Sequence, residues 1–151
     1  MTAAPRYTSA LPDPARRPDF YEGVPAKRGA AWGIDMVITA AMAIMALPFT
    51  AFTGLFFFPF LMAVIGFFYR WITISAGSAT LGMRIMGIEL READGGRLSS
   101  GTALFHTLGY MVSFMAAPLQ LLSIGLMFGT QRGQGLSDLV LGTTAINRPL
   151  R

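Results

Sequence analysis

Cysteine is missing from this 151-residue sequence, which excludes disulfide bonds, cysteine-based metal sites and thiol chemistry. The single histidine, His106, argues against a histidine-based metal site or a catalytic triad. Charge is also scarce, since charged residues make up 13% of the chain and soluble domains carry about 25%. The N-terminus lacks the apolar stretch of a cleavable signal peptide, so we expect the first membrane span to direct the chain to the membrane.

Hydrophobic residues make up 53% of the chain and are gathered into long runs. Between Gly29 and Trp71 the only charged residues are Asp35 and Arg70, and residues 98–131 contain none. Runs of this length predict membrane-spanning helices. Most of the basic residues flank the apolar runs, as the positive-inside rule expects, so the net charge of +4 indicates topology and not nucleic-acid binding.

The apolar runs predict an arrangement of spans around short connections. Residues 1–26 are rich in proline and arginine and should form a disordered cytoplasmic tail. We expect spans over 29–49 and 55–74, antiparallel because the connection between them is short and uncharged. The N-terminus should then be cytoplasmic, and Tyr69, Arg70 and Trp71 should anchor the second span at the membrane interface.

A third apolar stretch over 102–128 is longer than one standard span and has Pro118 near its middle. Either one long kinked helix or a helical hairpin broken near Pro118 fits this stretch, and the basic C-terminal segment favours the hairpin. In the polar segment before it, Asp94-Gly95-Gly96 predicts a β-hairpin that pairs 86–92 with 97–99, to which 143–146 could add a strand. The predicted fold is therefore an all-α membrane bundle of three to four transmembrane or re-entrant helices with a small cytoplasmic β-hairpin.

Asp35 is a carboxylate inside the first apolar span. Arg28 precedes it by two helical turns, so the two side chains share one face of the helix. An ionised aspartate within a span is unfavourable by roughly 2.5–3.5 kcal/mol and is retained with a partner, with water, or with both. Two roles stay open for Asp35: a cation or proton site, or a polar staple that fixes helix packing.

Three other motifs predict little chemistry. Gly77 and Gly82 have the outer spacing of a phosphate-binding loop, but Met83-Arg84 stands in place of the Lys-Ser/Thr pair, so a turn is the better interpretation. The lone His106 fits an interfacial residue better than a ligand. Gly29 and Gly33 would permit close helix contact, which in a glycine-rich membrane chain is weak evidence.

Three segments of the chain resemble the RDD family of bacterial membrane proteins, which is named for one arginine and two aspartates. They are Lys27-Arg28-Gly-Ala-Ala-Trp-Gly-Ile-Asp35, then Gly77-Ser-Ala-Thr-Leu-Gly-Met-Arg-Ile-Met-Gly-Ile-Glu89, and Arg132-Gly-Gln-Gly-Leu-Ser-Asp138-Leu-Val-Leu-Gly-Thr143. The resemblance covers about residues 27–147 and implies a multi-pass protein of the bacterial inner membrane. It also implies that Arg28, Asp35 and Asp138 are the naming residues, in one cluster at the cytoplasmic interface. Family members often carry a basic residue where Met83 stands and a histidine where Ser137 stands, so this chain departs from the pattern there.

Two functions follow as expectations. The first is a membrane protein that moves, or helps to move, a cation, a proton or a small solute, because some family members resemble sodium/proton antiporters. The second is a non-catalytic scaffold or assembly partner held together by the polar cluster. No nucleophile–base pair or metal set is evident, so we expect no enzyme, no catalytic residue and no cofactor. The expected partners are the lipid bilayer and further copies of the chain.

Overall fold

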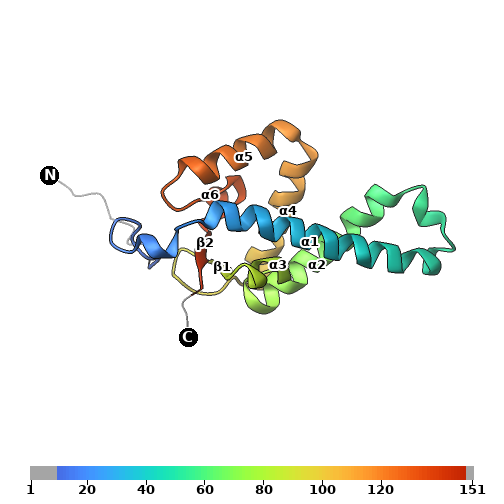
Figure 1. The fold of residues 1–151 in the computed structure, drawn as a ribbon, viewed down its shortest axis with the longest axis horizontal. Coiled ribbons are helices and arrows are strands. Elements are labelled where there is room, and N and C mark those ends of the chain that lie inside the picture. The colour runs from blue at the N-terminus through green and yellow to red at the C-terminus, as the bar shows by residue number, and fades with distance from the viewer. Residues whose placement is uncertain (1–9, 149–151) are drawn as a thin grey trace.

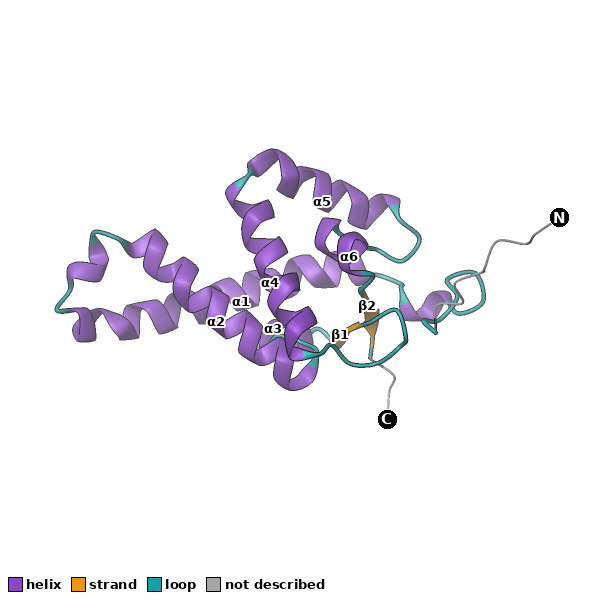
Figure 2. Ribbon diagram, turned by 180° about the vertical axis from the view of Figure 1, so that it is seen from behind, coloured by secondary structure: helices purple, strands orange, loops and turns teal. Residues whose placement is uncertain are grey.

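The computed structural model describes residues 10–148, which form helices and one two-stranded sheet (Figures 1 and 2). The α-helices are α1 (Val24–Ala46), α2 (Phe58–Gly77), α3 (Leu81–Ile85), α4 (Ser100–Met115), α5 (Ala117–Gly129) and α6 (Leu136–Leu141). The 3-10 helices are η1 (Pro18–Phe20), η2 (Leu47–Thr50) and η3 (Thr53–Leu55), and the strands are β1 (Ile88–Arg91) and β2 (Thr144–Asn147).

Helices α1 and α2 have the length and composition of membrane spans. Their 23 and 20 residues correspond to about 34 and 30 Å, and the hydrocarbon core of a bilayer is about 30 Å thick. Two helices in the described chain are long and apolar enough to cross a membrane, or three if α4 and α5 count as one bent span. Large apolar side chains such as Ile44, Phe60 and Phe128 lie exposed on the outer surface, where lipid would cover them. The chain is therefore a helical membrane protein, as its sequence predicts.

Proline marks the start of each long apolar helix except α4. Pro25, Pro59 and Pro118 all lie in the first turn of their helices, where the missing N–H removes no intrahelical hydrogen bond. Ser99 instead caps α4, accepting a hydrogen bond from the backbone N–H of Thr102 at 3.1 Å.

The third apolar stretch is broken into α4 and α5, which are bent by 118° to one another. The break lies at Ala116, whose extended backbone ends α4, and Pro118 follows two residues later. Proline cannot continue a helix because its ring collides with the carbonyl group four residues earlier. The sharp bend divides the stretch into two helices near Pro118, as both expected geometries allow, and α6 lies beside α4 and α5 (Figure 2).

The small antiparallel sheet is present, and the strand expected over 143–146 does pair with the first strand, whereas the expected pairing with 97–99 is absent. Strand β1 pairs with β2, with Ile88 opposite Asn147, and the prediction that 86–92 would pair with 97–99 is wrong. The Asp94-Gly95-Gly96 turn does form, but Leu98 then packs into the core and donates its N–H to Ser78 Oγ at 2.8 Å. That bond leaves 97–99 unable to form a ladder with β1.

The predicted disorder of 1–26 does not extend over the described part of that segment. Tyr21 is buried and donates a hydrogen bond to the carbonyl oxygen of Pro12, and helix α1 already begins at Val24. Asn147 donates hydrogen bonds to two carbonyl groups of this segment. Tertiary contacts with β2 thus order a stretch whose composition alone could not. Residues 1–9 lie outside the described residues.

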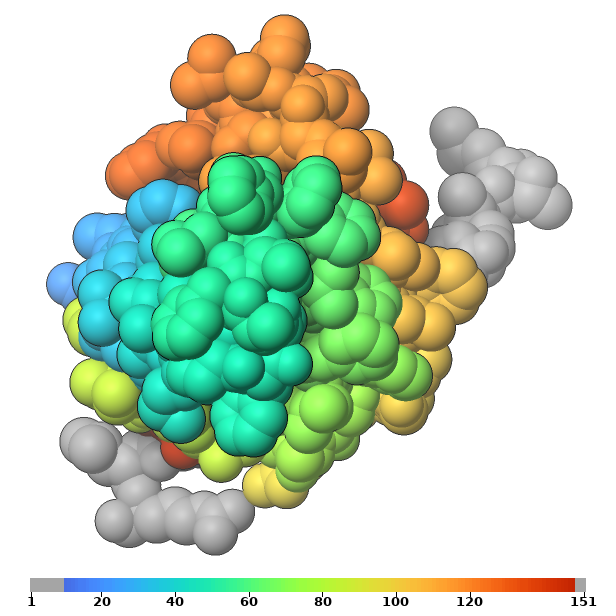
Figure 3. All heavy atoms as spheres, turned by 90° about the vertical axis from the view of Figure 1, so that its right-hand side faces the viewer, coloured from blue at the N-terminus to red at the C-terminus, as the bar shows by residue number. Residues whose placement is uncertain are grey.

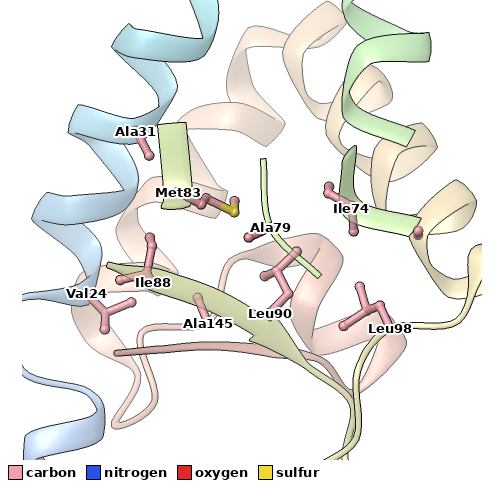
Figure 4. Close-up of a cluster of buried hydrophobic side chains, with 10 residues drawn as sticks. Val24, Ala31, Ile74, Ala79, Met83, Ile88, Leu90, Leu98 and Ala145 are labelled. Carbon is pink, nitrogen blue, oxygen red and sulfur yellow. The ribbon is translucent and has the colours of Figure 1, made fainter. Parts of the chain in front are cut away.

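The buried core lies at the end of the molecule that holds the sheet, called the polar end here. Figure 4 shows Ile74, Ile88 and Leu90 converging between α1, α2, α3 and the sheet. Burying each such side chain contributes roughly 1.5–3 kcal/mol. The opposite end, residues 47–57, is formed by η2, η3 and the turns around them, and it projects beyond α4 and α5 (Figures 1 and 3). The core therefore fixes the polar end, where the polar residues of the bundle also gather.

Candidate functional site

Asp35 lies buried on α1 and is held by four groups from α2 and α3. Its Oδ1 accepts hydrogen bonds from Tyr69 Oη at 2.5 Å and from the Gly82 backbone N–H at 2.8 Å. Its Oδ2 accepts one from Thr80 Oγ1 at 2.6 Å and lies 3.9 Å from Arg70 Nη1. Three of the four donors are neutral, so hydrogen bonds and not a tight ion pair hold this carboxylate.

Gly82 is needed where α3 crosses α1. A Cβ atom at this position would lie 2.2 Å from the carbonyl oxygen of Ala31 and 2.8 Å from Asp35 Oδ1. Gly82, the second glycine of the motif that resembles a phosphate-binding loop, therefore permits close contact between α1 and α3 and donates its backbone N–H to Asp35. Gly29 and Gly33 do not have this role among the described residues, because a Cβ atom at either would meet nothing within 4 Å.

Asp138 is the second buried carboxylate, and it lies in the first turn of α6 with no exposed surface. Its Oδ2 accepts from Arg28 Nη1 at 2.5 Å and from the Gly135 backbone N–H at 3.0 Å. Its Oδ1 lies 2.9 Å from both His106 Nε2 and Thr143 Oγ1. Asp138 thus ties α1 and α4 to the C-terminal segment, more than a hundred residues along the chain from Arg28.

The charge of Arg28 decides the ionisation of Asp138. Burial alone would raise the pKa of this carboxyl, but the Arg28 charge, the hydrogen bond from His106 and the Gly135 N–H together outweigh burial. They hold the pKa of Asp138 well below its usual range. The side chain is therefore a carboxylate at neutral pH, with its charge balanced within the bundle.

Between the two carboxylates, Tyr110 of α4 joins α1 to α2. Its hydroxyl oxygen accepts a hydrogen bond from Trp32 Nε1 at 2.8 Å, and the Arg70 guanidinium lies over its ring at 4.1 Å from the centroid. A cation on an aromatic face at this distance is attractive, so Tyr110 holds Arg70 in place from one side.

A cavity of about 440 Å³ lies between α1, α2, α4, α5 and α6, and we call it the central cavity. Its charged and titratable lining consists of Arg28, Asp35, Arg70, His106, Tyr110 and Asp138. Hydroxyl and amide groups of Ser113, Gln120 and Ser123 add to the lining. Both buried ion pairs of the bundle thus border one space, large enough for a small ligand.

The three residues predicted to form one cluster all line the central cavity, but they do not contact one another as one group. Arg28 pairs with Asp138, whereas the cation nearest to Asp35 is Arg70. Arg28 therefore compensates the charge of Asp138 and not that of Asp35. Arg70 is the cation beside Asp35. These two residues are also the only charged ones between Gly29 and Trp71.

Three residues of the site have other surroundings than the sequence suggested. Arg70 and Tyr69 are buried inside the bundle, at 8% and 6% exposed, and do not act as interface anchors. His106 is 2% exposed and contacts Asp138, where an interfacial position was predicted. Thr80 and Thr143, which bond the two carboxylates, carried no signal that could be found in the sequence, because isolated threonines are common in membrane helices and loops.

The described residues include no group of three or more His, Cys, Asp or Glu side chains that could hold a metal ion. Each oxygen atom of Asp35 and Asp138 already faces two donors of the protein. A cation at either carboxylate would have to displace such bonds.

Comparison with known protein families gives one match. The model of the RDD family matches residues 23–142, which include both ion pairs and every lining residue of the central cavity. Searches of curated proteins and of solved structures return no similar chain.

Proposed function

The chain belongs to the RDD family, a family of membrane proteins, and from this premise we propose that it moves, or helps to move, a proton or a small polar solute through the central cavity. The observation that carries the proposal is the placement of His106. This buried histidine lines the cavity, contacts Asp138 through Nε2, and has no partner for Nδ1 among the described residues. A buried polar atom without a partner is unfavourable, and in a cavity wall it is a binding group for a solute or a relay for a proton.

The geometry supports a proton or a neutral or acceptor-bearing solute better than a metal cation. Asp35 accepts short hydrogen bonds from α2 and α3, which fits the polar-staple role of the two left open by the sequence. The transport role then falls to His106, with Arg28 and Asp138 fixing its position. The proposal is for a protein without enzymatic activity.

We further propose an orientation and an assembly. The basic residues that flank the spans place the polar end and the N-terminus on the cytoplasmic side of a bacterial inner membrane. Three or four short spans enclose little space by themselves, so a homo-oligomer would complete the path.

Proton flux in reconstituted vesicles tests the proposal. Vesicles that enclose a pH-sensitive dye are given a pH gradient, and the change in their internal pH is compared with that of protein-free vesicles. We expect flux in the parent protein, and its loss in His106→Gln at unchanged abundance and thermal stability. Arg97→Gln, an exposed arginine outside the cavity, is the matched control and should keep the flux.

The alternative function is a membrane scaffold, and a specific observation favours it: the site ties the two ends of the chain together through Arg28 and Asp138. On that alternative, the parent shows no proton flux above that of protein-free vesicles, and His106→Gln alters only the amount of folded protein. Absence of flux in the parent together with reduced abundance of the variant would overturn the transport proposal.

A further inference from the structure

A second cavity, of about 660 Å³, lies between α1, α2 and α4 and differs in character from the central cavity. Its lining is almost wholly apolar and includes Met36, Phe60, Ala63, Phe67, Met111 and Met115. We call it the apolar cavity. Asp35 and Arg70 are its only charged lining residues, and they belong to the wall that it shares with the central cavity.

Arg70 in this wall has hydrogen-bonding capacity that the protein does not use. A guanidinium group carries five N–H donors. Arg70 makes a 3.9 Å ion pair with Asp35 and stacks on Tyr110, but within residues 10–148 it donates no side-chain hydrogen bond, and its buried Nε has no partner. The nearest carboxylate is already occupied at 2.5–2.8 Å by Tyr69, Thr80 and Gly82. Such a group needs an acceptor from outside the chain.

The dimensions of the apolar cavity match an alkyl chain. Its lining follows α2 from Arg70 back to Pro59, a length of about 16 Å along the helix. The apolar cavity therefore has room for the chain of a lipid whose head group reaches Arg70.

The geometry points to a binding site for an acidic phospholipid, with a phosphate oxygen on Arg70 and an acyl chain in the apolar cavity. Phosphate oxygens fit a guanidinium well because two parallel N–H···O bonds can form. A zwitterionic lipid offers the same phosphate, but its own cation would lie beside Arg70 and weaken the contact. This inference goes beyond the proposed transport function and stands or falls separately from it.

Quenching of tryptophan fluorescence tests the site. The chain has two tryptophans, and Trp32 lines both cavities. In a Trp71→Phe background Trp32 is the only tryptophan, and its emission is excited selectively at the red edge of the absorption band. The protein is reconstituted into phosphatidylcholine vesicles with an equal mole fraction of either chain-brominated phosphatidylglycerol or chain-brominated phosphatidylcholine. We expect several-fold stronger quenching by the brominated phosphatidylglycerol, and equal quenching by the two lipids would overturn the proposal.

Two variants assign the preference to this site. Arg70→Gln should reduce quenching by phosphatidylglycerol to the level of phosphatidylcholine, and the exposed Arg97→Gln should leave the preference unchanged. If Arg70→Gln does not fold, Ala63→Phe decides, because it fills the apolar cavity without altering a charge. An unchanged preference for phosphatidylglycerol in Ala63→Phe would place the acidic lipid elsewhere and overturn the site.

Discussion

Asp35 and Asp138 are both buried aspartates beside an arginine, yet they are stabilised in different ways. Arg28 meets Asp138 at 2.5 Å, whereas Arg70 stays 3.9 Å from Asp35, whose short contacts come from neutral donors. The Asp138 site joins the first helix to the last one, and the Asp35 site joins consecutive elements of the first half. Asp138 therefore links the first and last helices through an ion pair with Arg28. Asp35 instead fixes the contacts of α1 with α2 and α3 through hydrogen bonds.

The largest effect is expected from Asp138→Asn. It leaves the Arg28 guanidinium buried without its counter-charge, which should lower the free energy of unfolding by about 3–5 kcal/mol. Thermal or denaturant unfolding in detergent micelles measures the loss. Arg28→Gln combined with Asp138→Asn removes both charges and should be less destabilised than Asp138→Asn alone. Asp94→Asn, at an exposed aspartate, is the control, and a double variant no more stable than the single one would break the charge-based account.

Gly82→Ala comes next. The added methyl group would overlap the Ala31 carbonyl and the Asp35 carboxylate, so α3 must move away from α1 and weaken the hydrogen bonds to Asp35. We expect a loss of about 2–3 kcal/mol, the upper part of the usual range for overpacking. Gly125→Ala in α5 is the matched control, since nothing lies within 4 Å of its Cβ position, and it should be neutral or slightly stabilising. Equal stability of the two variants would show that α1 and α3 are not in close contact.

Asp35→Asn should have a smaller effect than Asp138→Asn. The amide still accepts a hydrogen bond at its oxygen, but its NH₂ group faces donors, so about 1–3 kcal/mol of stability should be lost. The same unfolding measurement applies, and flux per folded molecule should be retained. A loss as large as that of Asp138→Asn would mean that Arg70 depends on Asp35 as strongly as Arg28 depends on Asp138.

The smallest expected effect is the pH dependence that Asp138 contributes to stability. Because its folded-state pKa is depressed, it contributes stability that is fully present above the unfolded pKa of about 4 and is lost as pH falls toward the lower folded value. Unfolding temperatures followed downward from neutral pH should therefore fall more steeply below about pH 4 in the parent than in Asp138→Asn. Parallel curves for the two proteins would contradict the low folded-state pKa.

Much of the architecture is readable from local patterns. Apolar run length predicts α1 and α2 to within a few residues, and Pro118 marks the break between α4 and α5 because proline cannot continue a helix. The candidate site was readable in part. Asp35 stands out because charge is rare in its apolar run, Arg28 because it shares the helix face of Asp35, and Asp138 through the resemblance to the RDD family. All three line the central cavity.

The pairing within the site was not readable, because it depends on contacts between residues far apart in the chain. Only the folded chain brings His106 and Thr143 to Asp138, and Thr80 to Asp35. The sheet was readable in part: the strand expected over 143–146 pairs with β1, whereas 97–99 does not, because Leu98 packs into the core. Sequence alone determined that this is a helical membrane protein with a few buried charges. Long apolar runs are more stable in lipid than in water, and in lipid the backbone must satisfy its own hydrogen bonds by forming helices. Tertiary structure decided which arginine meets which aspartate, because a buried charge is satisfied by whichever partner the packing brings within reach.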